Sequence, residues 1–132
     1  MTTAVAHRQR ILLIEDDEAI ARLLHVYLDS AGYDVHVEHD GHHAITYATL
    51  HQPDLVILDL RLPDMHGYDV CRELRKTYHS WVLPIMMLTG MDTPIDQLRG
   101  YAFGADAYLT KPFEPPELLP TVELLLGRTG PE

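Results

Sequence analysis

The chain has 132 residues, 46% of them hydrophobic and 23% charged, and a formal net charge of −10 at pH 7. This length suits one domain with a single substantial core, and the balance is that of a globular chain rather than a disordered one. The acidic excess argues against direct binding to nucleic acid or to an anionic membrane surface, because both need clustered Lys and Arg.

Three further features narrow the class. The single cysteine, Cys71, excludes an intramolecular disulfide and a thiolate metal cluster, and its apolar helical context indicates a core residue rather than a nucleophile. No stretch approaches the ~18–20 apolar residues of a membrane span. The first ten residues, MTTAVAHRQR, lack the apolar run of a secretory signal. We therefore expect a protein that works in the cytoplasm and not at a membrane.

The first half of the chain alternates predicted strands and helices. Ile11–Ile14 is continuously apolar, which is typical of a strand in a parallel sheet covered on both faces. The helix that follows would end near Gly32, and its predicted inward face is Ile20, Leu23, Leu24, Tyr27 and Leu28. Asp34–Glu38 alternates Val with polar residues, as an edge strand does. A second helix starts at Asp40-Gly41, with Ala44, Ile45 and Ala48 inward.

The second half continues the alternation. Asp54–Leu58 and Pro84–Leu88 are apolar runs that predict two more buried strands. The helix between them has Val70, Cys71 and Leu74 on its apolar face. Thr93–Phe103 predicts a helix with Thr93 as N-cap and Pro94 at the first helical position. Ala107–Thr110 predicts the last strand.

The last predicted helix, Pro115–Leu126, contains a proline. Its inward face would be Leu118, Leu119, Val122, Leu125 and Leu126. Pro120 lies inside this pattern, where it removes a hydrogen bond and clashes with the preceding turn, so we expect the helix to kink or to start late. Residues 1–9 and 127–132 are predicted to be tails, and 127–132 could be the stub of a linker.

Five successive strand–helix units predict a doubly wound α/β sheet. In such sheets the functional crevice lies beyond the carboxyl ends of the strands, so the residues that follow the strands are the candidates for a functional site. These residues are Glu15, Asp16, Asp17 and Glu18 after the first strand, Asp59 after the third, Thr89-Gly90 after the fourth and Lys111-Pro112 after the fifth.

This set predicts a cation site beside a nucleophilic carboxylate. Several acidic groups at one point repel each other unless a cation neutralises them, and Mg²⁺ favours such oxygen ligands. A carboxylate next to Mg²⁺ and a lysine is equipped to accept a phosphoryl group. Taken singly, Glu15–Glu18 could be a solvated helix start and Lys111 a surface charge. Asp59 is harder to dismiss, because an acid directly after the apolar run Leu55–Leu58 needs a partner.

The sequence resembles the receiver domain of bacterial two-component response regulators. The resemblance runs from about residue 10 to 126 and is carried by ILLIEDDE (11–18), DLVILDLRLPDMHG (54–67), PIMMLTG (84–90) and GADAYLTKPF (104–113). It implies a CheY-like, flavodoxin-like (βα)5 fold with strand order 2-1-3-4-5, and a receiver domain spanning 10–126.

The resemblance also implies roles for the residues at the strand ends. Asp59 is similar to the phosphorylation site of the family, and Lys111 is similar to the lysine that holds a phosphoryl oxygen. The Lys111-Pro112 peptide bond is implied to be cis. Thr89 and Tyr108 are similar to the switch pair, whose hydroxyl and aromatic ring move on phosphorylation. The implied Mg²⁺ ligands are Asp16, Asp59, the Arg61 backbone carbonyl and, through water, Glu15.

Two points about the site stay open at this stage. An acidic pair Glu15-Asp16 fits the family spacing to Asp59, whereas the alternative pair Asp16-Asp17 does not, so Asp17 would be an exposed helix-start residue. Arg61 and Met91 are expected to lie beside the acceptor, where their side chains would hinder or admit the attacking water and so set the lifetime of the phosphorylated form.

The implied function is phosphoacceptor signalling, not enzymatic turnover. The receiver would take its phosphoryl group from a histidine kinase or phosphotransfer protein, assist its own phosphorylation and dephosphorylation, and switch the surface of its fourth helix, fifth strand and fifth helix to control an output domain or effector protein. Ala107 replaces an acid of the salt-bridge set that winged-helix regulators use to dimerise, so a monomer or another phosphorylation-dependent dimer is expected.

The residues argue against three other interpretations. A Mg²⁺-dependent phosphohydrolase would place an acid two residues after the nucleophile, where this chain has Arg61. A receiver-like module that works without phosphorylation would not need the full set of site residues. Nine histidines, including His36, His39, His42 and His43, suggest zinc, but their spacing gives no convincing ligand geometry and a solvated surface is favoured. Trp81 is expected to pack in the loop before the fourth strand or to meet a partner.

Overall fold

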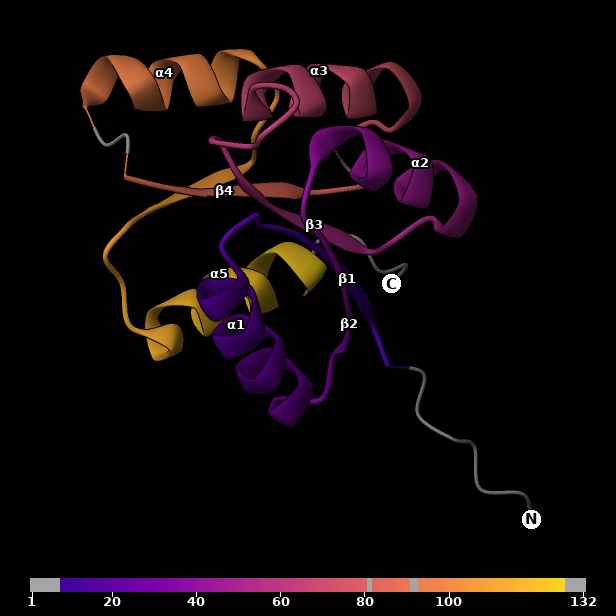
Figure 1. Cartoon of the computed structure of the whole chain (residues 1–132), viewed down its shortest axis with the longest axis vertical. Helices are drawn as coiled ribbons and strands as arrows, with labels where there is room; N and C mark the ends of the chain where they lie inside the picture. Colours follow the sequence, from indigo (N-terminus) through magenta and orange to yellow (C-terminus); the bar gives the residue numbers. More distant parts are fainter. Residues whose placement is uncertain (1–7, 81, 91–92, 128–132) are drawn as a thin grey trace.

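The computed structural model describes residues 8–80, 82–90 and 93–127 (Figure 1). Within these residues, five strands alternate with five helices. In chain order they are β1 (Arg10–Ile14), α1 (Glu18–Ser30), β2 (Asp34–Glu38), α2 (Gly41–His51), β3 (Leu55–Asp59), α3 (Gly67–Thr77), β4 (Ile85–Thr89), α4 (Pro94–Ala102), β5 (Ala107–Thr110) and α5 (Pro115–Gly127). None of these helices is long and apolar enough to cross a membrane. Trp81 lies outside the described residues.

All five strands are parallel, in the order β2-β1-β3-β4-β5. Helices α1 and α5 cover one face of the sheet, and α2, α3 and α4 cover the other (Figure 1). The predicted doubly wound, flavodoxin-like fold and its strand order are confirmed. Because every strand runs the same way, the carboxyl ends of β1, β3, β4 and β5 meet at one edge of the sheet.

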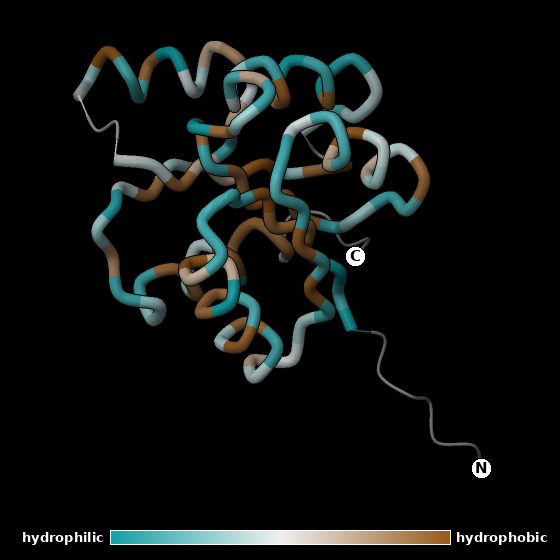
Figure 2. The backbone as a smooth tube through the Cα atoms, in the orientation of Figure 1, coloured by the Kyte–Doolittle hydropathy of each residue, from teal (hydrophilic) through white to brown (hydrophobic). Residues whose placement is uncertain are grey.

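The core has two halves, one on each face of the sheet. Alternate residues of β1 divide between them: Leu12 and Ile14 belong to the half under α2 and α3, and Ile11 and Leu13 to the half under α1 and α5. The hydrophobic colouring accordingly concentrates along the strands at the centre of the molecule (Figure 2). A strand buried on both faces must be apolar at every position, which explains the continuous runs in the sequence.

The buried face of α1 differs from the predicted one. Ala21, Leu24 and Leu28 are buried, while Leu23 is 55% exposed. The spacing of three and four residues defines one stripe on a helix, and Leu23 lies about 100° away from Leu24 around the axis. Hydrophobicity alone assigned Leu23 to the stripe, although α1 meets the sheet along a narrower line.

Two strands extend one residue further than predicted. β3 and β4 both start and end one residue later than expected, which makes Asp59 and Thr89 the last residues of their strands. Just before β3, Asp54 pairs with Arg10 of β1 in two ways: its N–H donates to the Arg10 carbonyl at 2.8 Å, and its carboxylate accepts from the Arg10 N–H at 2.8 Å. Pro84 has no N–H to donate, which is why the ladder of β4 starts after it.

Of the two outcomes expected for the last helix, a kink or a late start, the late start is wrong. α5 starts at Pro115 and continues through Pro120 to Gly127. Pro115 and Pro116 occupy the first turn, where backbone N–H groups have no helical partner and the fixed φ of proline is favourable. Pro120 is exposed, so the carbonyl that it leaves without a helical partner lies on the solvent side. Leu119 is half-buried, and the other four predicted residues are buried.

Candidate functional site

Three acidic side chains meet at the carboxyl ends of β1 and β3. These strands are neighbours in the sheet, with Ile14 opposite Leu58, so the residues that follow, Glu15 and Asp59, are also adjacent. Glu15 is 1% exposed and Asp59 7% exposed, while Asp16 is exposed. One carboxylate oxygen from each of Glu15, Asp16 and Asp59 lies within 4.8 Å of the others. The predicted clustering of these residues is therefore present.

Lys111 reaches the same point from the end of β5. Its Nζ donates to Glu15 Oε1 at 2.9 Å and to Asp59 Oδ2 at 3.3 Å. The Lys111–Pro112 peptide bond is cis, as the resemblance predicted. Since β4 separates β3 from β5, only a long side chain can span from β5 to both carboxylates.

The charges in this cluster shift one another. Burial raises the pKa of Glu15 to about 7 against a usual value of 4.5, with the negative charge of Asp59 adding to the rise and Lys111 opposing it. Burial alone would lower the pKa of Lys111, but the two carboxylates outweigh it and raise that pKa. The site thus carries more negative charge than its single lysine neutralises, which favours a further cation.

The loop after β3 is held close to Asp59. The Arg61 N–H, near the start of this loop, donates to Asp59 Oδ1 at 3.3 Å. At its far end the Gly67 N–H donates to the Leu60 carbonyl at 2.8 Å. A Cβ at Gly67 would lie 2.6 Å from Leu60 Cα, so only glycine allows α3 to begin this close to the end of β3.

Thr89 and Tyr108 lie on the neighbouring strands. Thr89 is buried at the end of β4, and its carbonyl accepts the Lys111 N–H at 2.8 Å. Tyr108, on β5, is half-buried and packs against the core half under α2 and α3. Its ring lies directly beneath α4, because a Cβ at Gly100 would be 3.2 Å from Tyr108 Cδ2. Tyr108 therefore lies against α4, while Thr89 ends the strand next to the one that ends in Asp59.

Asp17 lies outside the acidic group. Its carboxylate caps α1 by accepting from the Ala19 N–H at 2.9 Å and the Ile20 N–H at 3.1 Å. This is the exposed helix-start position expected for the Glu15-Asp16 register. Met91, which was expected beside the acceptor, lies outside the described residues.

Comparison with known proteins identifies the family. Residues 11–123 match the model of the response regulator receiver domain. The chain belongs to this family. It is 45% identical over 120 residues to the DNA-binding dual master transcriptional regulator RpaA of Synechocystis sp., covering 91% of this chain and 50% of that protein. It is 40% identical over 121 residues to the alkaline phosphatase synthesis transcriptional regulatory protein PhoP of Bacillus subtilis, covering 92% and 50%.

Solved structures agree with this result. The CheY-like receiver domain protein of Methanospirillum hungatei superposes with a TM-score of 0.87 at 27% identity, covering 93% of this chain and 97% of that one. This receiver domain spans about half the length of the curated relatives it matches.

Each of the four histidines that are close in sequence, His36, His39, His42 and His43, contacts a carboxylate or a backbone carbonyl. His36 Nε2 lies 2.6 Å from Glu38 Oε2, and His43 Nδ1 lies 2.7 Å from Asp40 Oδ2. His39 Nδ1 lies 2.9 Å from the Glu15 carbonyl, and His42 contacts Asp64. Over residues 8–80, 82–90 and 93–127, the cluster of possible metal ligands is Glu15, Asp16 and Asp59, and no histidine belongs to it.

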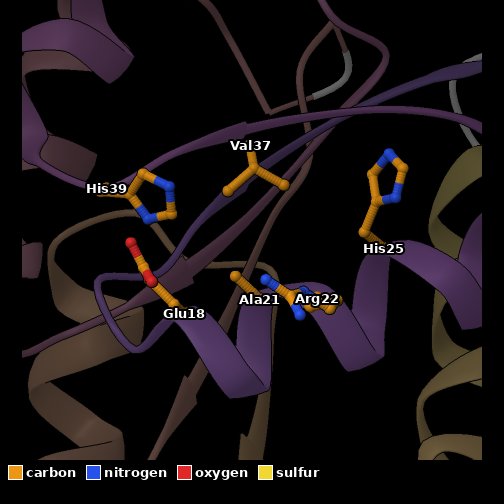
Figure 3. Close-up of a pocket in the computed structure, with 6 residues that line it drawn as sticks. All are labelled: Glu18, Ala21, Arg22, His25, Val37 and His39. Carbon is orange, nitrogen blue, oxygen red and sulfur yellow. The ribbon is translucent and has the colours of Figure 1, made fainter.

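Two hollows flank α1. One, of about 260 Å³, lies between α1 and the edge strand β2, with Glu18 and His39 at one end and His25 at the other (Figure 3). The other, of about 380 Å³, is mainly apolar and borders the site; its lining is Ile20, Leu23, Leu24, Lys111, Pro112 and Phe113. The exposed Leu23 therefore forms part of a surface next to the acidic cluster.

Sequence reasoning missed one residue of this region. Asp64, in the loop after β3, accepts hydrogen bonds from the Gly41 N–H at 2.8 Å and the His42 N–H at 2.9 Å, and so caps α2. Asp64 lies inside the motif DLVILDLRLPDMHG (54–67). Helix caps are normally sought next to the helix in sequence, however, and Asp64 lies 23 residues from Gly41.

Proposed function

We propose that Asp59 accepts a phosphoryl group from a phosphohistidine of a partner kinase or phosphotransfer protein, in a Mg²⁺-dependent reaction. The observation that carries this proposal is a buried carboxylate whose neighbours are two further acids and one lysine, Lys111 Nζ lying 3.3 Å from Asp59 Oδ2. The alternative of a receiver-like module without phosphorylation gives no reason to keep so costly a cluster buried.

The side chains present fit Mg²⁺. The donors are hard oxygen ligands, which this ion prefers. Burial, together with the negative charge of Asp59, raises the pKa of Glu15, and a divalent cation would offset the cost of keeping Glu15 ionised there. Asp16, Asp59 and the Arg61 carbonyl would hold the ion, with Glu15 acting through water. Bound there, the ion supplies neutralisation of the charge on the transferring phosphoryl oxygens.

The chemical step needs little from the protein besides placement. An oxygen of Asp59 attacks phosphorus and forms the P–O bond while the P–N bond to the donor imidazole breaks; the imidazole leaves with the electron pair and takes up a proton. Lys111, which now bridges Glu15 and Asp59, would instead pair with a phosphoryl oxygen. Reversal of the modification follows when water attacks the same phosphorus, and the side chains of Arg61 and Met91 would govern its access.

The phosphorylated state would be relayed through Thr89 and Tyr108. The buried Thr89 hydroxyl would move to the phosphoryl group, and the Tyr108 ring, already beneath α4, would turn into the space it leaves. The outer face of α4 bears three exposed apolar side chains, Ile95, Leu98 and Tyr101, which suit contact with an output partner. We therefore place the output surface on α4, β5 and α5.

The partners follow from these assignments. A histidine kinase or phosphotransfer protein supplies the phosphoryl group in the cytoplasm, and an output domain or effector protein receives the signal. RpaA is named as a DNA-binding regulator and PhoP as a transcriptional regulatory protein. A transcriptional output is accordingly proposed for the assembly in which this receiver works, whereas the receiver itself, with a net charge of −10, would not grip nucleic acid.

The test is phosphorylation by a small donor. Incubation with acetyl phosphate and Mg²⁺ should add one phosphoryl group, detectable by intact mass, that is stable in acid and labile in base. Asp59→Asn should abolish the adduct, and chelation of Mg²⁺ should abolish it in the wild-type protein. Asp17→Asn is the matched control, because it removes a neighbouring acid that only caps α1, and it should keep the adduct. Labelling of Asp59→Asn at the wild-type level would refute the assignment.

A further inference from the structure

We propose that Asp64 is a positioning residue that fixes the loop between β3 and α3, and with it the Arg61 carbonyl, by capping the N-terminus of α2. The inference deepens the proposed function and rests on it, since Arg61 matters only if its carbonyl serves the metal site. The loop concerned comprises residues 60–66.

The cap is made by both oxygens of one carboxylate. Asp64 Oδ1 accepts from the Gly41 N–H at 2.8 Å, and Oδ2 accepts from the His42 N–H at 2.9 Å and also contacts His42 Nδ1. Partial burial opposes ionisation of Asp64, but these hydrogen bonds lower its pKa to about 2. The side chain is 25% exposed although it belongs to an outer loop. The negative charge of Asp64 is also favourable because the N-terminus of a helix carries a partial positive charge.

The cap is additional to the one that α2 has from its own sequence. Asp40, the residue before the helix, accepts from the His43 N–H at 2.8 Å. The two carboxylates together serve the first three N–H groups of α2. Loss of Asp40 would weaken the helix end alone, whereas loss of Asp64 would also release the loop.

Apolar packing also holds the loop against the start of α2. Gly41 is buried, and a Cβ there would meet Met65 Sδ at 2.6 Å and Val70 Cγ2 at 2.9 Å. The start of α2 therefore lies directly on Met65, the residue after Asp64, and no side chain fits between them. A polar contact and an apolar contact from adjacent loop residues hold the loop to one helix.

The other end of the loop is tied to the acceptor strand. Gly67 donates to the Leu60 carbonyl at 2.8 Å, and Arg61 pairs with His66 across the loop. The loop is thus closed at its base beside Asp59 and anchored at its tip on α2. With both ends fixed, the Arg61 carbonyl has a fixed direction, which a metal site requires of its ligands.

The experiment compares Asp64→Ala with Asp40→Ala by titration of each protein with Mg²⁺ in a calorimeter. Loss of a residue that orients a metal ligand commonly costs 10–100-fold in affinity, so Asp64→Ala should weaken Mg²⁺ binding on the order of 10-fold. Asp40→Ala removes a cap from the same helix end and should leave the affinity within about 2-fold of wild type. Asp64→Asn, which keeps one acceptor oxygen, should fall between wild type and Asp64→Ala.

Hydrogen exchange without metal gives an independent readout. Asp64→Ala should speed exchange of the Arg61 and Gly67 amides, and Asp40→Ala should affect only amides at the start of α2. Equal effects of the two substitutions on loop exchange and on Mg²⁺ affinity would overturn the inference. If the wild-type protein binds no Mg²⁺, the proposed function fails, and loop exchange then decides alone whether Asp64 holds the loop.

Discussion

At the scale of single residues, Glu15 is the side chain whose environment is most unusual. It is 1% exposed, shares Lys111 with Asp59 and has a pKa raised to about 7 by burial and by the neighbouring charge. The protein therefore keeps a carboxylate where its ionised form is disfavoured. Such a cost is typical of functional sites rather than of structural ones.

The pH dependence of stability should reveal this cost. In the unfolded chain Glu15 has a pKa near 4.5, so between about 4.5 and 7 the folded protein binds more protons than the unfolded one. The free energy of unfolding of the metal-free protein should accordingly fall as pH rises through this window. Glu15→Gln should flatten that part of the profile, measured as melting temperature against pH in EDTA.

The control for this measurement is Glu18→Gln, which neutralises an exposed acid in the first turn of α1. Its profile should follow that of the wild-type protein. Mg²⁺ added at pH 7.5 should restore stability to the wild-type protein, because binding to the folded state alone raises the free energy of unfolding. A Glu15→Gln profile as steep as that of wild type would contradict the burial argument.

Most of the site could be predicted because its residues lie at strand ends. Parallel topology brings the residues after β1, β3 and β5 to one edge, so Glu15, Asp59 and Lys111 meet whatever the details of the loops. Asp64 could not be predicted in this way. Its partner is a helix end 23 residues earlier, and only the path of the loop brings them together.

At the scale of elements, periodicity predicted every strand and helix but not every face. Leu23 and Leu24 have the same hydrophobicity, and only the contact with the sheet decides that one is 55% exposed and the other buried. α5 shows the limit of a local rule: the penalty for an interior proline is real, yet the packing of Leu118, Val122, Leu125 and Leu126 holds the helix in place.

The penalty should be measurable. Pro120→Ala restores one backbone hydrogen bond and removes a clash of ~3 kcal/mol in a regular helix, while greater freedom of the unfolded chain returns ~1 kcal/mol. We expect a net stabilisation of roughly 1–2 kcal/mol in urea unfolding. Pro116→Ala is the matched control, because this exposed proline lies in the first turn, where no hydrogen bond is gained. Equal changes for the two variants would show that α5 has already relaxed around Pro120.

At the scale of the whole molecule, the two edges of the sheet have different roles. At the edge with the carboxyl ends, the carboxylates of Glu15, Asp16 and Asp59 lie close together and repel one another. At the opposite edge, Arg75 of α3 donates to Asp106 Oδ2 at 2.6 Å, to the Leu83 carbonyl at 2.6 Å and to the Gly104 carbonyl at 2.9 Å. This one side chain joins α3, the segment before β4 and the turn before β5. The end of the sheet opposite the acidic cluster therefore holds α3 against the sheet.

Replacement of Arg75 should therefore cost stability without altering the site. Arg75 and Asp106 have side chains only 15% and 8% exposed, and removal of one partner from such a pair leaves a buried charge, which costs about 3–5 kcal/mol. Arg75→Met should lower the free energy of unfolding by roughly this amount in urea titrations. Arg72→Met, one turn of α3 earlier, removes an exposed pair with Asp69 and should change it by less than about 1 kcal/mol. At temperatures where both variants are folded, the rate of labelling by acetyl phosphate should match wild type. A slower rate in Arg75→Met alone would mean that the two edges of the sheet are coupled rather than independent.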